Sequence, residues 1–289
     1  MREIREKAYA KLNLSLDVTG RREDGYHEML MVMQTVSLCD DIRIRIHESG
    51  PVRAESNLSF VPCDERNLAV KAALCYLEAV GEPGRGMQIV MQKKIPVGAG
   101  MAGGSSDAAA VLRGLNRYFG NRLSRKELEE LACSVGSDVA FCVAGGTALA
   151  KGRGEVLEDL QPMPDCHLVI CKPEFSVSTP ELFKKLDASH RHNHPDTPGI
   201  LHALEQGQLR ELCLRMYNVF EEVEDRRMRT VAQIKGKLLD HGALGAIMTG
   251  TGSAVFGVFE EEENAVRACR VLGKEFRFSC VARPQGRLL

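Results

Sequence analysis

Hydrophobic and polar residues alternate along residues 8–18, AYAKLNLSLDV, near the start of the chain. Leucines at every second position share one face, and Lys11 and Asn13 lie on the opposite face, as in a half-buried strand. Contact with solvent would explain the polar face. A cleft into which Lys11 and Asn13 point together would explain it equally well, and the alternation leaves both explanations open.

Hydrophobic periodicity predicts a mixture of strands and helices along the rest of the chain. Strands are predicted at residues 42–46, 87–91, 167–171, 244–248, 253–259 and 276–282. Helices are predicted at residues 67–80, 106–118, 125–134, 198–223, 226–240 and 262–273, and another begins at Thr179 and Pro180. The pattern loosens at residues 152–165, where we place the boundary between two domains, 1–155 and 156–289. The order of elements beyond this boundary predicts an α+β second domain.

Composition and charge narrow the classes of partner. The chain has 289 residues, of which 44% are hydrophobic and 27% charged, as is usual for a globular protein. Its 38 basic and 39 acidic side chains give a net charge of −1, so no nucleic-acid partner is expected. No apolar run reaches the length of a membrane span, and residues 1–7 lack the core of a signal peptide. We therefore expect a cytoplasmic protein with no membrane partner, and the oligomeric state is left open.

Cysteine and histidine spacing predicts neither disulfides nor a structural metal. The ten cysteines include no C-x-x-C pair, and several lie inside apolar periodic segments, so we interpret them as reduced thiols. His190, His192 and His194 form an H-x-H-x-H pattern. Their polar surroundings favour an exposed loop over a metal site.

Glycines are concentrated in residues 95–110, IPVGAGMAGGSSDAAA. Glycine allows positive φ and lets the backbone approach a ligand closely. Ser105 and Ser106 are candidate N-caps, Asp107 is interpreted as stabilising the helix start, and the dipole there favours an anion. The stretch predicts a phosphate-binding loop, and the simpler alternative is a glycine-rich turn with ordinary caps.

The context of this stretch excludes two common nucleotide-binding motifs. Residues 98–103, GAGMAG, satisfy the dinucleotide fingerprint G-x-G-x-x-G, which is a weak signal alone. A dinucleotide site also needs a second parallel strand that ends in an acidic residue about 20 positions later, whereas two predicted helices follow here. The chain has no G-x-x-x-x-G-K-[ST] motif, so the stretch is not a standard P-loop.

Three segments together resemble the GHMP kinases, a family of small-molecule kinases that includes galactose, homoserine and mevalonate kinases. Residues 96–109, PVGAGMAGGSSDAA, resemble the phosphate-binding loop of that family. The strand with Lys11 and the loop MTGTGS at 248–253 resemble two of its other motifs. AKLN at 10–13 followed by GYH at 25–27 resembles the members whose acceptor carries a cytidine diphosphate group.

The resemblance implies a two-domain α+β fold. Its N-terminal domain would be a ribosomal-protein-like β-α unit, and its C-terminal domain would be ferredoxin-like. ATP, with Mg²⁺, and a small-molecule acceptor would bind in the cleft between them. The implied reaction is transfer of the γ-phosphate of ATP to the tertiary 2-hydroxyl of the acceptor.

The resemblance implies that Asp138 and Lys11 are the catalytic residues. Asp138, in the sequence GSDV, would take the proton of the acceptor hydroxyl, because a tertiary alcohol is a poor nucleophile. Lys11 would lie beside it, keep the carboxylate ionised and orient the hydroxyl. The simpler alternatives are a turn carboxylate for Asp138 and a solvated strand face for Lys11.

The resemblance also assigns residues to the acceptor. Tyr26 and His27 would stack on the cytosine base and hydrogen-bond its edge. Phe183, which follows Thr179 in the next predicted helix, would form a second aromatic wall, although a position in a helix core is nearly as good an explanation. Asn13 and Thr179 are further candidate contacts of the acceptor.

The ATP-binding residues implied by the resemblance are mostly in the glycine stretch. Asn67 and Lys94 would lie near the adenine, and Ser106 would contact Mg²⁺ or a phosphate. The full predicted set is Asn67, Lys94, Pro96, Val97, Gly98, Ala99, Gly100, Met101, Ala102, Gly103, Gly104, Ser105 and Ser106.

The chain departs from the family pattern at three positions. Ala99 and Ala102 stand where relatives usually have glycine, so we expect negative φ at both. Ala140 stands where relatives usually have proline. Two alternative functions are a kinase of the same family with a homoserine-type or mevalonate-type acceptor, and a non-catalytic or dinucleotide-dependent nucleotide-binding protein. The GYH segment and Phe183 argue against the first, because those acceptors have no base to stack. The presence of Lys11 and Asp138 argues against a non-catalytic protein, and the missing acidic strand end argues against a dinucleotide.

Overall fold

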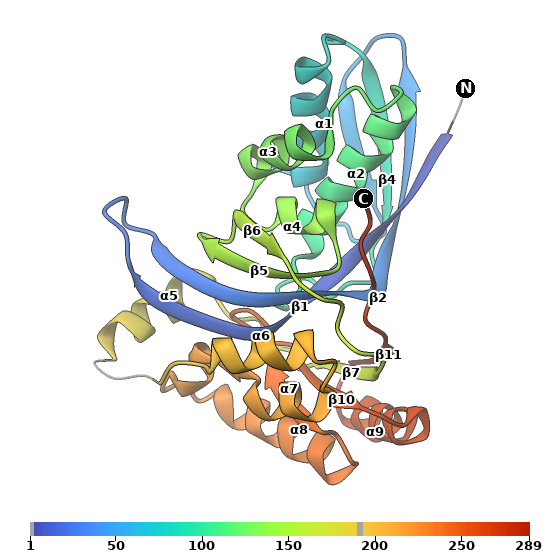
Figure 1. Cartoon of the computed structure of the whole chain (residues 1–289). Helices are drawn as coiled ribbons and strands as arrows, with labels where there is room; N and C mark the ends of the chain where they lie inside the picture. Colours follow the sequence, from blue (N-terminus) through green and yellow to red (C-terminus); the bar gives the residue numbers. More distant parts are fainter. Residues whose placement is uncertain (1–2, 190–192) are drawn as a thin grey trace.

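The computed structural model describes residues 3–189 and 193–289, which form two β-sheets with helices packed against them (Figure 1). In the larger sheet the strand order is β3-β4-β2-β1-β8, and in addition β5 pairs with β2 and β6 with β5. Its strands are β1 (Glu3–Arg21), β2 (His27–His47), β3 (Val52–Ser56), β4 (Gly86–Gln92), β5 (Thr147–Gly152), β6 (Val156–Asp159) and β8 (Tyr217–Asn218). The smaller sheet has the order β11-β7-β10-β9. Its strands are β7 (His167–Lys172), β9 (Gly245–Met248), β10 (Val255–Phe259) and β11 (Phe278–Ala282).

The long strands β1 and β2 pair antiparallel and cross the middle of the molecule (Figure 1). Their register shifts between Tyr9 and Lys11 and again between Asn13 and Ser15. Such bulges bend a strand and redirect its side chains. Lys11 and Asn13 are 4% and 0% exposed, so contact with solvent does not explain the polar face of this strand.

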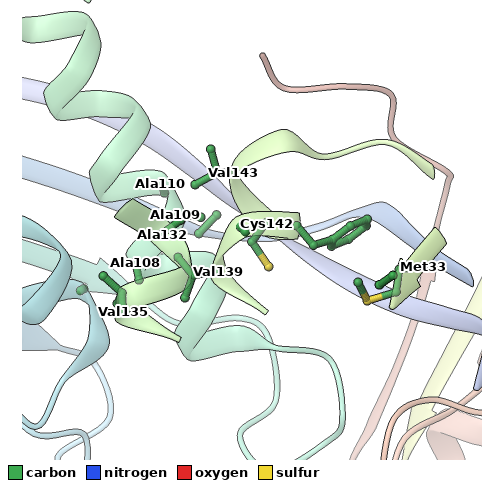
Figure 2. Close-up of a cluster of buried hydrophobic side chains, with 14 of the residues drawn as sticks. Met33, Ala108, Ala109, Ala110, Ala132, Val135, Val139, Cys142 and Val143 are labelled. Atoms are coloured by element: carbon green, nitrogen blue, oxygen red, sulfur yellow. The ribbon is translucent and has the colours of Figure 1, made fainter. Parts of the chain in front are cut away.

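Helices α1 (Leu68–Ala79), α2 (Gly103–Tyr118), α3 (Arg125–Val135) and α4 (Val139–Ala144) form the helical layer of the larger sheet (Figure 1). The alanine run 108–110 of α2 is fully buried in one cluster with Val139 and Val143 of α4 (Figure 2). Small side chains let the two helices approach closely. Ser106 Oγ of α2 is 3.5 Å from Cys142 Sγ of α4. The start of α4 is thereby held beside the start of α2.

The helices of the C-terminal half are α5 (Thr179–Ala188), α6 (Thr197–Glu205), α7 (Leu209–Arg215), α8 (Met228–Asp240) and α9 (Glu262–Glu275). Helices α7, α8 and α9 contact the smaller sheet, whereas α5 lies beside the β1–β2 hairpin (Figure 1). The prediction of one helix over 198–223 is wrong. This segment contains α6, α7, β8 and the 3-10 turn η1 (Val219–Glu222). Gly207 ends α6, because it takes φ +64 while Gln208 N donates back to Ala203 O at 2.8 Å.

The predicted α+β fold with two units is confirmed by the two sheets and their helices. The domain boundary predicted at 155/156 falls in the hairpin of β5 and β6, and because these strands pair with each other, β6 belongs to the larger sheet. Strand pairing alone would place the division after Asp159, and the boundary itself stays a prediction.

No helix within residues 3–189 and 193–289 is long and apolar enough to cross a bilayer.

Candidate active site

A cleft of about 790 Å³ is lined by residues from both halves of the chain. An adjoining cavity of about 250 Å³ is lined by Leu68, Lys93 and all of residues 95–105. The predicted site residues that line the larger cleft are Lys11, Tyr26, His27, Gly98, Gly100, Ala102, Ser105, Asp138, Thr179 and Phe183. The remaining predicted loop residues from Pro96 to Gly104 line the smaller cavity. Asn13, Asn67, Lys94 and Ser106 line neither of them.

Two glycine-containing loops from opposite halves of the chain contact each other beside the cleft. A Cβ added to Gly100 would lie 2.2 Å from Thr249 O, and a Cβ added to Gly250 would lie 2.9 Å from Gly100 O. Both glycines have positive φ, +75° and +57°. Ala254 N donates to Ala99 O at 3.2 Å and joins the loops a second time. Only residues without a Cβ allow this approach, so the glycine spacing of both loops follows from the contact.

The start of α2 differs from the prediction. Its N-cap is Ala102, and neither Ser105 nor Ser106 caps the helix. Ala102 has φ +56, so the expected negative φ is wrong at this position, while Ala99 is outside the set of residues with positive φ. No side chain caps the first N–H groups of α2. These groups are therefore available to an anion in the cleft.

Ser105 and Ser106 have different environments. Ser106 is 1% exposed, and its hydroxyl donates to Ala102 O at 3.0 Å, within the protein. Ser105 lines both cavities, and within residues 3–189 and 193–289 its hydroxyl has no hydrogen-bond partner. The hydroxyl that faces a ligand is thus that of Ser105, because the helical turn places Ser106 against α4.

Asp138 is the N-cap residue of α4, but its side chain makes no capping hydrogen bond. It lines the cleft, and its carboxylate has no hydrogen bond or ion pair with any described residue. Lys11 lines the same cleft, and its Nζ donates to Asn13 Oδ1 at 2.7 Å instead of pairing with Asp138. A carboxylate with no structural hydrogen bond and a nearby ammonium group can accept a proton from a bound hydroxyl and orient it.

Asn13 is held at two of its polar groups. Its backbone N–H donates to Thr249 Oγ1 at 3.0 Å, and its Oδ1 accepts from Lys11 Nζ. Its Nδ2 is buried and has no partner among the described residues. Because Asn13 is 0% exposed and lines neither cavity, this unpaired donor does not by itself support the predicted contact with the acceptor.

Aromatic rings form one wall of the cleft. His27 stacks on Phe183 with ring centroids 4.4 Å apart and an angle of 25°, and Phe183 meets Phe220 edge-on at 4.9 Å. Asp187 Oδ1 is 2.8 Å from His27 Nε2 and fixes the imidazole. The structure thus brings His27 and Phe183 together, as predicted for the acceptor side. Because His27 already covers one face of Phe183, these two rings leave no gap for a base between them.

Arg153 is a cleft residue that the sequence analysis missed. It lies in the turn between β5 and β6, and its guanidinium is 4.2 Å from the centroid of the Tyr26 ring, which is otherwise 55% exposed. A Cβ added to the next residue, Gly154, would lie 4.0 Å from Asp138 Oδ1, so this turn also approaches the candidate base. Arginine in the sequence GRGE carries no local signal other than a turn.

Other contacts around the cleft were also not predicted. Thr251 Oγ1 lies 2.9 Å from Thr179 Oγ1 and links the C-terminal glycine loop to the start of α5. Asp187 is one turn after Phe183 on that same helix. Residues four apart share a helix face, and this spacing was the available signal for Asp187.

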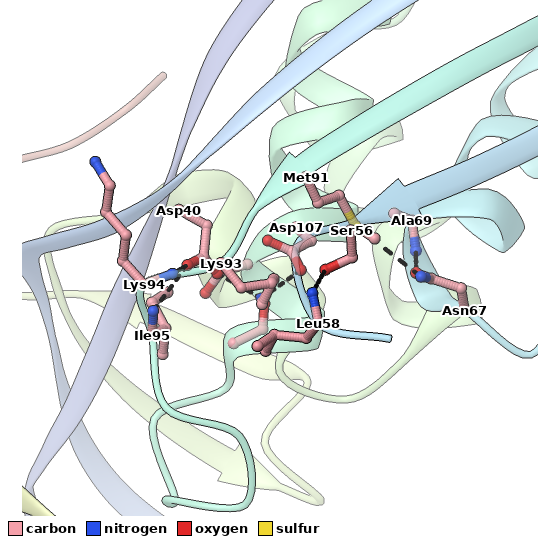
Figure 3. A network of polar contacts seen from close by, with 12 residues as sticks. Asp40, Ser56, Leu58, Asn67, Ala69, Met91, Lys93, Lys94, Ile95 and Asp107 are labelled. Atoms are coloured by element: carbon pink, nitrogen blue, oxygen red, sulfur yellow. Dashed lines mark hydrogen bonds and ion pairs between the residues drawn. The ribbon is translucent and has the colours of Figure 1, made fainter. Parts of the chain in front are cut away.

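A buried ionic network lies next to the glycine stretch 95–105 (Figure 3). Lys93 Nζ contacts both Asp40 and Asp107, and Asp40 also accepts from the backbone N–H groups of Lys94 and Ile95. Asp107 Oδ1 is buried and has no partner among the described residues. Burial raises the pKa of Asp107 to about 7, while the ammonium group of Lys93 opposes this shift. The interpretation of Asp107 as a stabiliser of the helix start is therefore replaced by a role in this network.

Two predicted adenine-side residues have structural partners. Lys94 Nζ pairs with Asp41 at 2.7 Å on the surface, and its neighbour Lys93 lines the cavity instead. Asn67 is the N-cap of α1: its Oδ1 accepts from Ala69 N at 3.0 Å, and its Nδ2 donates to Pro62 O at 2.8 Å. Of the three histidines in the H-x-H-x-H pattern, His190 and His192 lie outside the described residues, and His194 Nδ1 lies 3.0 Å from both carboxylate oxygens of Asp17.

Comparison with known proteins agrees with this geometry. The model of the GHMP kinases N terminal domain matches residues 67–146, and that of the GHMP kinases C terminal domain matches residues 200–277. A 4-diphosphocytidyl-2-C-methyl-D-erythritol kinase of Bacillus licheniformis is 46% identical over 264 residues, which cover 91% of each chain. The protein of the same name from Syntrophomonas wolfei is 45% identical and covers 92% of this chain and 93% of its own.

Solved structures extend the comparison to the fold. The crystal structure of a 4-(cytidine 5'-diphospho)-2C-methyl-D-erythritol kinase superposes with a TM-score of 0.83 at 34% identity, covering 98% of this chain and 100% of that one. A homoserine kinase from Cytophaga hutchinsonii shares the fold, with a TM-score of 0.78 at 21% identity and coverage of 99% and 96%. These similarities run through both halves of the chain and include the loops that form the cleft. The chain belongs to the GHMP kinase family.

Proposed function

We propose that this protein transfers the γ-phosphate of ATP to the 2-hydroxyl of 4-diphosphocytidyl-2-C-methyl-D-erythritol, a step of the non-mevalonate route to isoprenoid precursors. The observation that carries the proposal is that one cleft contains both the Lys11 and Asp138 pair and the His27 and Phe183 wall. A kinase for this acceptor needs a base at the hydroxyl and a flat surface for cytosine. The names of the relatives at 42–46% identity support the same acceptor.

The reaction assigns separate tasks to the two charged groups. Asp138, whose carboxylate has no partner among the described residues, accepts the proton of the attacking hydroxyl. Lys11 holds the hydroxyl near that carboxylate and balances its charge. The transition state spreads negative charge over the transferred oxygens, so positioning and charge neutralisation supply most of the catalysis.

ATP would place its phosphates against the start of α2 and the two glycine loops. Uncapped N–H groups at a helix N-terminus bind phosphate oxygens, and Gly98 and Gly100 line the cleft beside this helix start. The expected Mg²⁺ fits the hydroxyl oxygen of Ser105, which lines the cleft and has no hydrogen-bond partner in the described part of the chain. Ser106 fits less well, because its hydroxyl already donates to Ala102 O. Mg²⁺ would neutralise the phosphate charge.

The alternative acceptors, homoserine and mevalonate-type alcohols, have no base to stack. An aromatic wall of His27, Phe183 and Phe220 with an exposed Tyr26 opposite Arg153 would serve no purpose for such compounds. The wall therefore favours a nucleotide-linked acceptor. The cytoplasmic location expected from the sequence stays a prediction.

A coupled assay of ADP release with a panel of alcohols tests the proposal. We expect turnover with 4-diphosphocytidyl-2-C-methyl-D-erythritol and none above background with homoserine or mevalonate. The same assay with the acceptor lacking its cytidine group measures how much the base contributes to KM. Turnover of homoserine or mevalonate without turnover of the cytidyl substrate would overturn the assignment.

A further inference from the structure

A second large groove lies outside the active-site cleft. Its volume is about 810 Å³, and it is lined by residues of β1, β2, β4 and α2 and by the final residues of the chain, Leu288 and Leu289. It shares no lining residue with either active-site cavity. Helix α2 begins at the cleft, and Arg117 near its other end lines the groove, about 21 Å further along at 1.5 Å per residue.

The groove follows an edge of the larger sheet that no strand within residues 3–189 and 193–289 covers. β1 pairs with β2 on one side, whereas on the other side it pairs only with β8, at Ser15 and Leu16. Residues 5–9 of β1 therefore form an open edge beside α2. The Lys7 carbonyl on this edge accepts a hydrogen bond from Arg113 Nη2 at 2.8 Å.

Positive charge exceeds negative charge in the groove. Arg5, Lys7, Arg43, Arg113 and Arg117 line it, against the carboxylates of Glu6 and Asp41. Glu6 is paired with Arg117, and Asp41 is shared between Lys7 and the neighbouring Lys94. These pairings leave Arg43 and Arg113 without a carboxylate.

The two arginines at positions 5 and 43 are direct neighbours on the sheet. Arg5 is the register partner of Arg43, and like charges placed opposite each other on adjacent strands destabilise a sheet. Arg5 is paired with Glu3, but Arg43 has no hydrogen bond or ion pair with any residue of the described ranges. An anion bound between them would remove this repulsion.

Arg113 adds a buried cation on the helical side. It is 6% exposed, and its guanidinium donates only to neutral carbonyl groups, Cys142 O at 2.6 Å and Lys7 O at 2.8 Å. No carboxylate of the described residues lies within 4.0 Å of it, and burial lowers its pKa. A buried charge is normally paired, and Glu6, which raises the pKa of Arg113, is itself ion-paired with Arg117, so the positive charge of Arg113 is only partly balanced.

We infer that this groove binds a small anion with two or more linked phosphates, at a site distinct from the kinase centre. Guanidinium groups bind phosphate oxygens in bidentate fashion and remain charged, which suits the set of arginines here. The volume is within the range of small-molecule sites. The cations of the groove belong to β1, β2 and α2, and a chain of phosphates offers oxygen atoms to more than one of these elements at once.

Equilibrium dialysis with radiolabelled pyrophosphate tests the site on the full-length protein. We expect two bound pyrophosphates per wild-type chain, one in the phosphate-binding loop and one in the groove. The variant R5Q/R43Q should weaken the second by at least about tenfold and retain the first. The matched control R53Q/R267Q removes two exposed arginines elsewhere and should bind like the wild type. Unchanged kcat of R5Q/R43Q, with unchanged KM for ATP, shows that the variant is folded.

Three outcomes overturn the inference. The first is binding of only one pyrophosphate per wild-type chain, and the second is equal pyrophosphate binding by the wild type and R5Q/R43Q. The third is a loss of pyrophosphate affinity in R53Q/R267Q as large as that in R5Q/R43Q. A parallel arm uses orthophosphate, which should bind the groove at least about tenfold more weakly than pyrophosphate. A last arm uses phosphatidylglycerol vesicles: sedimentation with vesicles that depends on Arg5 and Arg43, without pyrophosphate binding, would assign the groove to a membrane surface and reject the small anion.

Discussion

Gly100 and Gly250 lie against each other across the two halves of the chain, and neither position has room for a Cβ. The carbonyl oxygen of Gly100 would be 2.9 Å from a Cβ on Gly250, and both residues have positive φ. The phosphate-binding loop is therefore shaped by the C-terminal half as much as by its own sequence. Changes at Gly250 should act on ATP binding although the residue is about 150 positions away in the chain.

We expect Gly250→Ala to lower the free energy of unfolding by about 2–4 kcal/mol, because a collision adds to the cost of positive φ. ATP affinity should fall with it. Gly207→Ala is the matched control, since Gly207 has φ +64 and nothing within 4 Å of an added Cβ. That variant should lose only about 1–2 kcal/mol and bind ATP normally. Denaturant unfolding and ATP titration measure both quantities, and equal losses in the two variants would contradict the packing argument.

Replacement of Asp138 by Asn should lower kcat by about 10²–10⁴-fold, because the amide cannot accept the proton of the hydroxyl. ATP affinity and stability should change little, since the carboxylate makes no hydrogen bond or ion pair with the described residues. Asp240→Asn, an exposed carboxylate at the end of α8, is the control for the lost charge. Turnover of Asp138→Asn close to that of the wild type would remove Asp138 as the base.

Ala102→Gly should stabilise the protein by about 1 kcal/mol, because Ala102 is held at φ +56. The matched variant Ala99→Gly should destabilise it, since Ala99 is 2% exposed and its methyl group packs in the core. Thermal unfolding of the two variants provides the comparison. A loss of stability in Ala102→Gly would show that the methyl group contributes more than the backbone costs.

Asp187→Asn should raise the KM for the cytidyl substrate roughly tenfold, equivalent to about 1.4 kcal/mol, and leave the KM for ATP unchanged. The reason is that Asp187 orients His27, which forms the aromatic wall with Phe183. Glu181→Gln on the same helix is the control, because Glu181 pairs with Lys185 and Arg227 and does not line the cleft. A proportional change in both KM values would indicate a general loss of structure instead.

Asp107→Asn should change how stability depends on pH. Burial raises the pKa of Asp107 to about 7, so the folded chain holds its proton more tightly than the unfolded chain does. The contribution of this carboxyl to the free energy of unfolding therefore falls as pH rises from about 4 to about 7. The Asn side chain does not titrate, so the variant does not lose free energy of unfolding over this pH range. Its free energy of unfolding should therefore rise relative to that of the wild type between about pH 5 and about pH 8. Urea unfolding at both pH values tests this, and a constant difference would argue against a titrating Asp107.

Much of the fold could be predicted from local patterns, because strand alternation and helical periodicity record which face is buried. The elements at 87–91 and 125–134 were found within a few residues on that basis. The pattern could not show that Gly207 interrupts an apolar helical repeat, because glycine is also tolerated inside helices. The two-residue strand β8 has no periodicity to detect.

The candidate-site residues that belong to sequence motifs could be predicted. The residues whose position depends on tertiary contacts could not. Lys93 and Lys94 are adjacent, and only the direction of the chain after β4 determines which one lines the cavity. Ala102 takes a left-handed conformation because the loop must enter α2 between fixed neighbours, against its own preference. The position of Arg153 could not be predicted, because its guanidinium reaches the Tyr26 ring from a turn that is distant in sequence.

The short pairing of β1 with β8 has a consequence for the order of folding. Ser15 and Tyr217 are about 200 residues apart in sequence, and contacts of such separation form late because a long loop must close first. Asn13, which binds Thr249 next to this pairing, can be fixed only after both halves have folded. During synthesis the N-terminal half therefore cannot complete its fold before the C-terminal half has formed. We expect the ability to bind ATP to be the last property that the nascent chain acquires.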